Sequence, residues 1–198
     1  GKVAAVLLAG GQGTRLGFDK PKGMYNIGVT RELYIFECLI NNVMEIVKKA
    51  GAWIPFYIMT SDKNYDDTTA FLKEKNYFGY NAEYIHFFKQ EMAPSVDYNG
   101  KLLMEAPDRL SLSPNGNGGW FSSLCRYGYD KQMKEAGVEW LTAFAVDNVL
   151  QRINDPAFVG AVIDSGCDCG GMVVRKAEPN ERVGVLCTED GKPSIVEY

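Results

Sequence analysis

The sequence predicts an α/β fold with a mixed, mostly parallel sheet flanked by helices and antiparallel β-structure near its C-terminal end. Strand patterns alternate with helical patterns along most of the chain, which is typical of this class. The first strand, 3–8, is continuously apolar, as expected for a strand covered on both faces, and a glycine-rich loop follows it directly. With 198 residues, of which 46% are hydrophobic, the chain is expected to form one domain over 1–198.

Two helices are predicted in the first half of the chain. Residues 32–49 carry apolar side chains at spacings of three and four, which line one helical face, and Gly51 ends the pattern. Residues 62–75 are also predicted to be helical, with Ser61 or Asp62 as the cap. Strands are expected at 3–8, 56–60 and 84–88.

The second half begins with a hairpin whose Asn99-Gly100 pair supplies the positive φ angles of a tight turn. An amphipathic stretch is expected over 120–135 and a strand over 140–146. Asp155 is predicted to cap a helix that runs to residue 165 and ends at Gly166. Antiparallel strands are expected at 173–176, 183–187 and 194–198, the last two joined by a turn at 189–192.

Charge and histidine content exclude several functions. The formal net charge is −4 and the isoelectric point about 5.1, which argues against nucleic acid as a partner. The single histidine, His86, rules out a histidine-rich zinc site, and any Ser-His-Asp relay would have to use it. Because it lies within a predicted strand, a packed or solvated histidine is favoured over a catalytic base.

The five cysteines have no disulfide-framework spacing and include no CxxC pair, which favours a reducing, cytoplasmic location. Cys167 and Cys169 are interpreted as two buried thiols; the alternative is a pair of ligands for a soft metal. No segment approaches the ~20 consecutive apolar residues that span a bilayer, so no membrane partner is expected.

The loop that follows the first strand is the strongest functional signal. Residues 8–17 read LAGGQGTRLG, and Lys22 lies in the Pro-Lys-Gly sequence just beyond. Glycines at this position leave backbone N–H groups open to a polyphosphate at the carboxyl edge of a sheet, and Arg15 and Lys22 add local positive charge. The loop lacks the third glycine of the dinucleotide-binding fingerprint, and it also lacks the Gly-Lys-Ser/Thr sequence that a P-loop requires. A purely structural turn remains an alternative, but it explains neither cation.

Together with other segments in the same order, this loop resembles the eukaryotic-type UDP-N-acetylhexosamine pyrophosphorylases, a group of the UDP-sugar pyrophosphorylases. The resemblance covers nearly the whole chain. The segments are 8–17 and 21–25 of the loop, then 57–61, 87–94, 114–119, 146–150, 183–185 and 196–198.

The resemblance implies a Rossmann-like nucleotide-diphospho-sugar transferase fold, similar to GT-A. It implies a uridylyltransferase that makes a UDP-sugar, with UDP-N-acetylglucosamine favoured, and pyrophosphate from UTP and a sugar 1-phosphate, with Mg²⁺ or Mn²⁺. Asn115 replaces an aspartate usual in the family, and Trp120-Phe121 replaces a pair made of a smaller and an aromatic residue, so the sugar pocket is expected to differ. The family's catalytic domain continues past the last segment, so the chain is expected to be its nucleotide-binding part.

By resemblance, the catalytic residues are Arg15 and Lys22, and Asp147 would hold the ribose or the metal ion. Three of the residues implied for the site have alternative interpretations: Lys22 as a solvated loop lysine, Gln90 as the end of a strand, and Asp147 as a helix cap. The implied nucleotide-binding residues are Leu8, Ala9, Gly10, Gly11, Gly13, Thr14, Gln90, Gly116 and Asp147, with Gln90 and Gly116 facing the uracil. The implied sugar-binding residues are Asn117, Gly184 and Glu197.

Three other functions stay open. Asn115 and Trp120 are compatible with a UDP-glucose pyrophosphorylase or one of broader sugar range. The expected truncation is compatible with a non-catalytic nucleotide-sugar sensor or binding fragment. An NAD-dependent oxidoreductase is kept because a glycine loop after a first strand is common to many enzymes.

Overall fold

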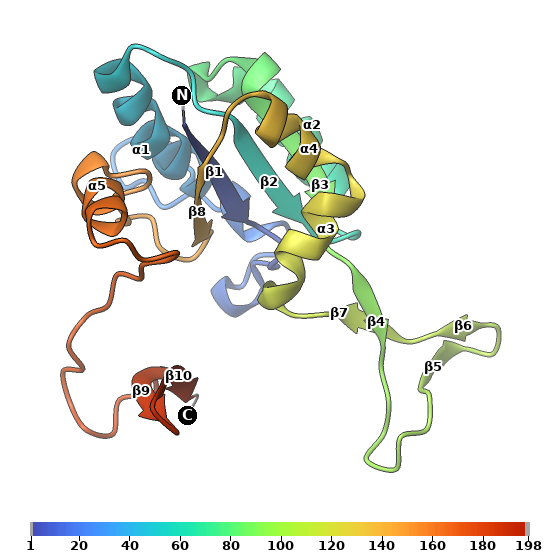
Figure 1. Ribbon diagram of the computed structural model, residues 1–198. Coiled ribbons are helices and arrows are strands. Elements are labelled where there is room, and N and C mark those ends of the chain that lie inside the picture. The colour runs from blue at the N-terminus through green and yellow to red at the C-terminus, as the bar shows by residue number, and fades with distance from the viewer. Residues whose placement is uncertain (1, 197–198) are drawn as a thin grey trace. The chain divides into compact units, whose positions relative to one another are not determined.

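A computed structural model of the chain describes residues 2–196 and divides them into two compact units, one ending at Phe158 and the other beginning at Val159. Each unit is described by itself. The first contains a four-stranded parallel sheet in the order β3-β2-β1-β8 (Figure 1). Its strands are β1 (Val3–Leu8), β2 (Phe56–Thr60), β3 (Ile85–Lys89) and β8 (Trp140–Ala145). The predicted α/β class with a mostly parallel sheet is confirmed.

Helices cover both faces of this sheet (Figure 1). Alternate side chains of β1 point to opposite faces, so Ala5 and Leu7 enter one core while Ala4 and Val6 enter the other. The first core is completed by α1 (Ile35–Ala50) and α2 (Tyr65–Glu74). The second is completed by α3 (Trp120–Arg126) and α4 (Tyr129–Glu135). Short 3-10 helices lie at Thr14–Leu16, Lys22–Met24, Asn76–Gly79, Ala82–Tyr84 and Asn117–Gly119.

The first helix begins later than residue 32. Tyr34 is its N-cap and Glu37 closes a capping box, so the helix starts at Ile35, while Gly51 ends it at φ +64° as predicted. The second helix begins at Tyr65 instead of Asp62. Asn64 is its N-cap, and the Ser61 hydroxyl accepts a hydrogen bond from the Asn64 N–H at 3.2 Å, which holds the turn before the helix.

The predicted amphipathic stretch over 120–135 forms two helices, α3 and α4, with a break between them. The break is at Gly128, whose φ of +75° places it in the left-handed region, and the Gly128 N–H caps the carbonyl of Cys125 at 2.9 Å. The two short helices still bury Leu124 and Met133 on the same face of the sheet.

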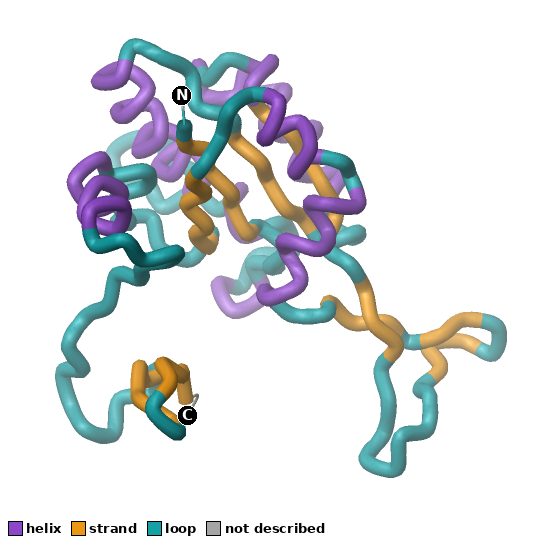
Figure 2. The backbone as a smooth tube through the Cα atoms, in the orientation of Figure 1, coloured by secondary structure: helices purple, strands orange, loops and turns teal. Residues whose placement is uncertain are grey.

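Two small antiparallel sheets follow β3 and extend away from the parallel sheet (Figure 2). The predicted turn is present, with the Asp97 N–H donating to the Lys101 carbonyl at 2.9 Å, but of the Asn99-Gly100 pair only Gly100 has a positive φ, +80°. The strands pair as β4 (Met92–Pro94) with β7 (Leu112–Pro114), and β5 (Met104–Ala106) with β6 (Arg109–Leu110).

The helix α5 (Pro156–Asp164) crosses the boundary between the units, and the second unit also contains the hairpin of β9 (Val185–Glu189) and β10 (Lys192–Val196). The Asp155 carboxylate accepts from the Ala157 N–H at 3.0 Å, as predicted for a cap. Asp190 and Gly191 form the predicted hairpin turn, with φ angles of +49° and +77°.

Two predictions for this second unit are wrong. Residues 173–176 form no strand: Val174 is 94% exposed, and no neighbouring strand pairs with the segment within residues 2–196. Cys167 and Cys169 are not buried thiols, because both are exposed in the irregular segment after α5. Among the residues described, the structure contains no helix long and apolar enough to cross a membrane.

Candidate functional site

The carboxyl ends of the four parallel strands lie at one edge of the sheet and carry the polar residues of the candidate site. The glycine-rich loop follows β1, the segment from Ser61 follows β2, Gln90 follows β3, and Asp147 follows β8 by two residues. Ligands of open α/β sheets bind outside this edge. The parallel topology therefore gathers segments that are more than 130 residues apart in the chain, from Leu8 to Asp147.

The glycine loop folds back on itself through two backbone hydrogen bonds. The Gly13 N–H donates to the Lys20 carbonyl at 3.0 Å, and the Lys22 N–H donates to the Gly11 carbonyl at 3.2 Å. Gly13 is required by packing, since a Cβ there would lie 2.8 Å from the Phe18 ring and 2.9 Å from the Phe18 carbonyl. A Cβ on Gly11 would meet nothing within 4 Å. The space at Gly11 is open to a ligand.

The two predicted cations and the predicted carboxylate line one cavity. Lys22 and Asp147 form an ion pair, and Arg15 lies on the wall of the same cavity, which has a volume of about 380 Å³. The Lys22 side chain is 16% exposed and that of Asp147 is 63% exposed, so the ammonium is held in the wall while the carboxylate faces solvent. The other lining residues are apolar: Leu16, Tyr25, Ile27, Ile35 and Val149.

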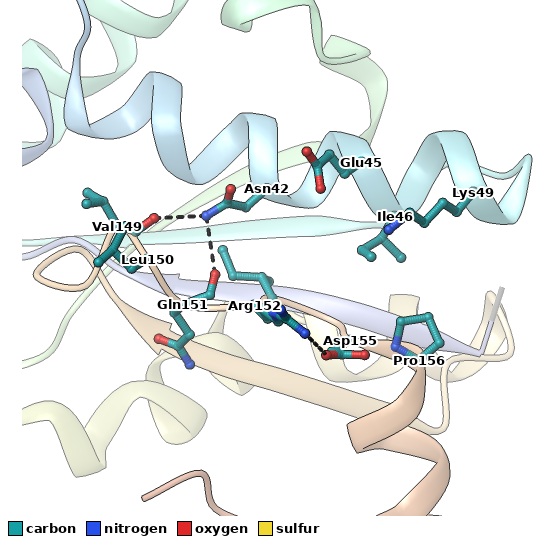
Figure 3. A pocket seen from close by; sticks show the side chains of 11 residues that line it. Asn42, Glu45, Ile46, Lys49, Val149, Leu150, Gln151, Arg152, Asp155 and Pro156 are labelled. Atoms are coloured by element: carbon teal, nitrogen blue, oxygen red, sulfur yellow. Dashed lines mark hydrogen bonds and ion pairs between the residues drawn. The ribbon is translucent and has the colours of Figure 1, made fainter. Parts of the chain in front are cut away.

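The segment after Asp147 is fixed to α1, as Figure 3 shows. The Asn42 side-chain amide donates to the carbonyls of Val149 and Gln151 at 3.0 and 3.2 Å. Asp147 lies in a turn that no helix follows, so its alternative interpretation as a helix cap is wrong. Asn42 also lines a second cavity of about 440 Å³ between α1 and residues 149–156.

Gln90 and Gly116, predicted to face the uracil, are joined directly. The Gln90 side-chain amide donates to the Gly116 carbonyl at 2.8 Å, and Gln90 is only 6% exposed. Gly116 has φ +85°, a conformation that favours glycine. A Cβ on Gly10 would lie 2.9 Å from the Gln90 side-chain oxygen, so Gln90 lies against the glycine loop. Asn117 follows in an exposed 3-10 turn.

The structure places the remaining predicted residues as follows. Leu8 is partly buried and its carbonyl accepts from the Val146 N–H at 3.1 Å, while Ala9 is buried and Thr14 is exposed. Gly184 belongs to the second unit, where it is exposed. Glu197 lies outside the described residues. Its role and that of Gly184 stay predictions.

One residue of the site was not anticipated. Asn64 is fully buried, and its side-chain amide donates to the carbonyls of both Gly10 and Gly11, at 3.0 and 3.2 Å. Its side-chain oxygen accepts from the Gln12 amide. The sequence holds a partial signal, since asparagine is a preferred N-cap and a helix is expected over 62–75. No local pattern, however, indicates contact with Gly10 and Gly11, which lie 54 and 53 residues earlier in the chain.

His86 takes no part in this arrangement. Its ring stacks on Tyr57 with centroids 4.9 Å apart and lies 5.4 Å from the Tyr129 ring. Burial among these aromatic residues lowers the pKa of His86 below its ordinary value. The packed histidine expected from the sequence is confirmed.

The residues present fit a divalent cation held jointly with a ligand. Within residues 2–196, no group of three or more histidine, cysteine or acidic side chains could hold a metal ion by itself. Mg²⁺ commonly uses one or two carboxylates together with substrate phosphates, and the exposed Asp147 carboxylate on the cavity wall satisfies the protein's share.

A parallel sheet whose first strand leads into an open glycine loop, with two cations beside it, defines an α/β protein of the nucleotide-binding class. The chain belongs to the UTP–glucose-1-phosphate uridylyltransferase family, whose model matches residues 1–198. The fold is accordingly that of the UDP-sugar pyrophosphorylases, as predicted.

Individual relatives agree with this assignment over the whole chain. It is 40% identical to UDP-N-acetylhexosamine pyrophosphorylase-like protein 1 of Mus musculus and 40% identical to UDP-N-acetylglucosamine pyrophosphorylase of Saccharomyces cerevisiae. It covers 40% and 42% of these two proteins. The crystal structure of the Trypanosoma brucei UDP-N-acetylglucosamine pyrophosphorylase in complex with inhibitor superposes with a TM-score of 0.89 at 33% identity, covering 100% of this chain and 42% of that one.

Proposed function

We propose that this chain is the nucleotide-binding part of a uridylyltransferase that makes UDP-N-acetylglucosamine and pyrophosphate from UTP and N-acetylglucosamine 1-phosphate. The observation that carries the proposal is the cavity in which Arg15, Lys22 and Asp147 meet beside the open glycine loop. The relatives at 40% identity support the choice of sugar, since they are named for N-acetylated hexosamines.

In the proposed reaction, a phosphate oxygen of the sugar 1-phosphate attacks the α-phosphorus of UTP. A new P–O bond forms while the bond from the α-phosphorus to the bridging oxygen breaks, and that oxygen leaves with pyrophosphate. The protein contributes positioning and charge stabilisation and needs no covalent nucleophile. The absence of a catalytic histidine is therefore compatible with the chemistry.

Each residue of the candidate site has a defined task in the proposed reaction. The open N–H groups near Gly11 bind phosphate oxygens, and Gln90 with Gly116 orients the base. Arg15 and Lys22 offset the charge that develops on the α-phosphate and the departing pyrophosphate. Mg²⁺, when bound by Asp147 and phosphate oxygens, would supply further positive charge.

In the proposed reaction, ligand binding replaces the Lys22–Asp147 ion pair with contacts to the ligands. In the structure the Asp147 carboxylate neutralises the Lys22 ammonium. Nucleotide phosphates compete for Lys22, and a cation competes for Asp147, so binding both partners exchanges one ion pair for two. Binding of the nucleotide therefore favours binding of the metal ion, and the reverse.

We place the reaction in the cytoplasm, where the five free thiols stay reduced.

Thermal unfolding with Mg²⁺ and a panel of nucleotides tests the proposal, because a ligand that binds the folded state raises its melting temperature. UTP and UDP-N-acetylglucosamine are expected to stabilise the chain, while ATP and NAD are not. Stabilisation by NAD alone would instead favour a dehydrogenase. Equal stabilisation by ATP and UTP would contradict uracil recognition by Gln90 and Gly116.

A second candidate, a pyrophosphorylase of broader sugar range, is favoured by Asn115 in the loop that carries Gly116. The backbone N–H of Asn115 donates to the Glu91 carbonyl at 3.1 Å, so this loop is bonded to the residue that follows Gln90. If UDP-glucose stabilises the chain more than UDP-N-acetylglucosamine does, this candidate replaces the first.

A further inference from the structure

Two buried polar residues, Asn64 and Gln90, lie against the glycine loop. Most buried polar residues described in the structure belong to the ends of β2 and β3 and the start of α2. These residues are Thr60, Ser61, Asn64, Thr68 and Gln90. Such a buried polar layer is costly unless it is hydrogen-bonded: the Asn64 and Gln90 side chains are bonded to backbone carbonyls, whereas the Thr60 and Thr68 hydroxyls have no partner among the described residues.

Asn64 is the member of this layer that reaches the loop backbone. Each hydrogen of its side-chain amide points to one carbonyl, that of Gly10 at 3.0 Å and that of Gly11 at 3.2 Å. Its side-chain oxygen accepts from the Gln12 side chain, so both ends of the amide are satisfied and its orientation is fixed. Asn64 itself is anchored by α2, because its carbonyl accepts from the Thr68 N–H at 2.9 Å.

These bonds set the direction of two peptide planes. In a trans peptide the N–H points opposite to the carbonyl of the preceding residue. With the Gly10 and Gly11 carbonyls turned toward Asn64, the N–H groups of Gly11 and Gln12 point away from it. Among residues 2–196 neither N–H has a hydrogen-bond partner, and the space at Gly11 is open.

We infer that Asn64 is a positioning residue that holds the Gly11 and Gln12 N–H groups in the orientation that receives the nucleotide phosphates. It touches no substrate and acts only through the loop. Preorganised donors bind a charged group better than mobile ones, because the loop does not have to be ordered when the ligand arrives. The inference rests on the proposed function for the identity of the ligand, but not for the effect on the loop.

Asn64→Ala tests this against a structural control, Tyr80→Phe. The Tyr80 hydroxyl is buried and donates to the Ile54 carbonyl at 2.6 Å, before β2 begins and so at the opposite edge of the sheet. Both variants lose buried hydrogen bonds to backbone carbonyls, so both are expected to unfold at a lower temperature. Only Asn64→Ala is expected to change the loop.

The first readout is backbone ¹⁵N relaxation of Gly10 to Gly13 without ligand. The loop is expected to be as rigid as the sheet in the wild type and in Tyr80→Phe, and mobile on the nanosecond scale in Asn64→Ala. Asn64→Leu keeps the approximate size of the buried side chain and adds no charge, so it is the variant to use if the alanine variant does not fold. It cannot donate to the two carbonyls, and the same mobility is expected.

The second readout is the Kd of UTP, tripolyphosphate and uridine for the alanine variant. The affinities for UTP and tripolyphosphate are expected to fall at least tenfold, and that for uridine to stay within twofold. A loop as rigid as in Tyr80→Phe, or equal losses for all three ligands, would overturn the inference. If the wild type binds UTP no more tightly than tripolyphosphate, the proposed function fails while the loop measurement still decides the role of Asn64.

Discussion

Lys22 and Asp147, which are 125 residues apart in the sequence, form an ion pair at the carboxyl edge of the parallel sheet. The pair joins the glycine loop after β1 to the segment after β8, two neighbouring strands of the sheet. Its lysine is largely buried and its carboxylate largely exposed. A ligand that enters the cavity beside Arg15 therefore meets the largely buried Lys22 ammonium and the exposed Asp147 carboxylate.

Lys22→Ala is expected to reduce UTP affinity by about 10- to 100-fold, because a hydrogen bond to a charged group contributes roughly 1.5–3 kcal/mol. Stability should change little, since the partner Asp147 is exposed and stays hydrated. Titration calorimetry measures the affinity. Lys20→Ala is the matched control: Lys20 pairs with Asp67 at 3.1 Å on the surface. A similar loss of UTP affinity in both variants would show a general charge effect and no specific role for Lys22.

Two glycine substitutions in the loop are expected to act differently. Gly11→Ala adds a Cβ that meets nothing within 4 Å, so the melting temperature should hold or rise slightly, while UTP binding is lost because the Cβ occupies the ligand's space. Gly10→Ala places a Cβ 2.9 Å from the Gln90 side-chain oxygen and displaces Gln90 from Gly116. That variant should lose about 1 kcal/mol of stability.

Denaturant unfolding and UTP titration of the two alanine variants provide the comparison. Tight UTP binding by Gly11→Ala would place the phosphates elsewhere. An unchanged preference for UTP over ATP in Gly10→Ala would contradict the assignment of Gln90 to the base.

Asn42→Ala is expected to lower the free energy of unfolding by about 1–3 kcal/mol, because it leaves two carbonyls without their donor. It should also weaken the Mg²⁺ dependence of UTP binding, since the segment it fixes carries Asp147. Glu45→Ala, three residues along the same helix and exposed, is the control for stability. Equal unfolding curves for the two variants would mean that the bonds to Val149 and Gln151 contribute nothing measurable.

His86 makes stability depend on pH. Burial lowers its pKa in the folded state, so between that pKa and the ordinary value near 6.5 the unfolded chain binds more protons than the folded chain. Stability from this residue is therefore complete above about pH 6.5 and falls as the pH is lowered toward the folded-state pKa. Urea unfolding at pH 7 and pH 5.5 should show a smaller loss in His86→Gln than in the wild type. The same loss in both would assign the dependence to other groups.

Much of the fold is predictable from local patterns. The apolar run of β1 and the helical spacing of α1 are strong because each reflects burial of a whole element, and both were located within a few residues. Local patterns failed where a tertiary partner decides the outcome. The apolar run around Val174 has the composition of a strand, but without a neighbouring strand its backbone has no partners and remains irregular.

Residues of the candidate site could be predicted from the sequence where the residue type alone indicates the chemistry. The sequence names the glycines of the loop, the cations Arg15 and Lys22 and the carboxylate Asp147 as candidates, and the structure brings these three charged side chains into one cavity. Asn64 was missed because its significance lies in its contacts with Gly10 and Gly11, and a helix cap with no further task has the same local sequence.

The sequence by itself determined that this chain is a mostly parallel α/β protein with a glycine-rich loop after its first strand, because burial periodicity and glycine content are local properties. Only the tertiary structure decided which groups meet at that loop. The strand order β3-β2-β1-β8 places Gln90 against Gly10 on one side and Asp147 against Lys22 on the other. Strand order depends on the packing of distant segments, and no spacing within the loop encodes it.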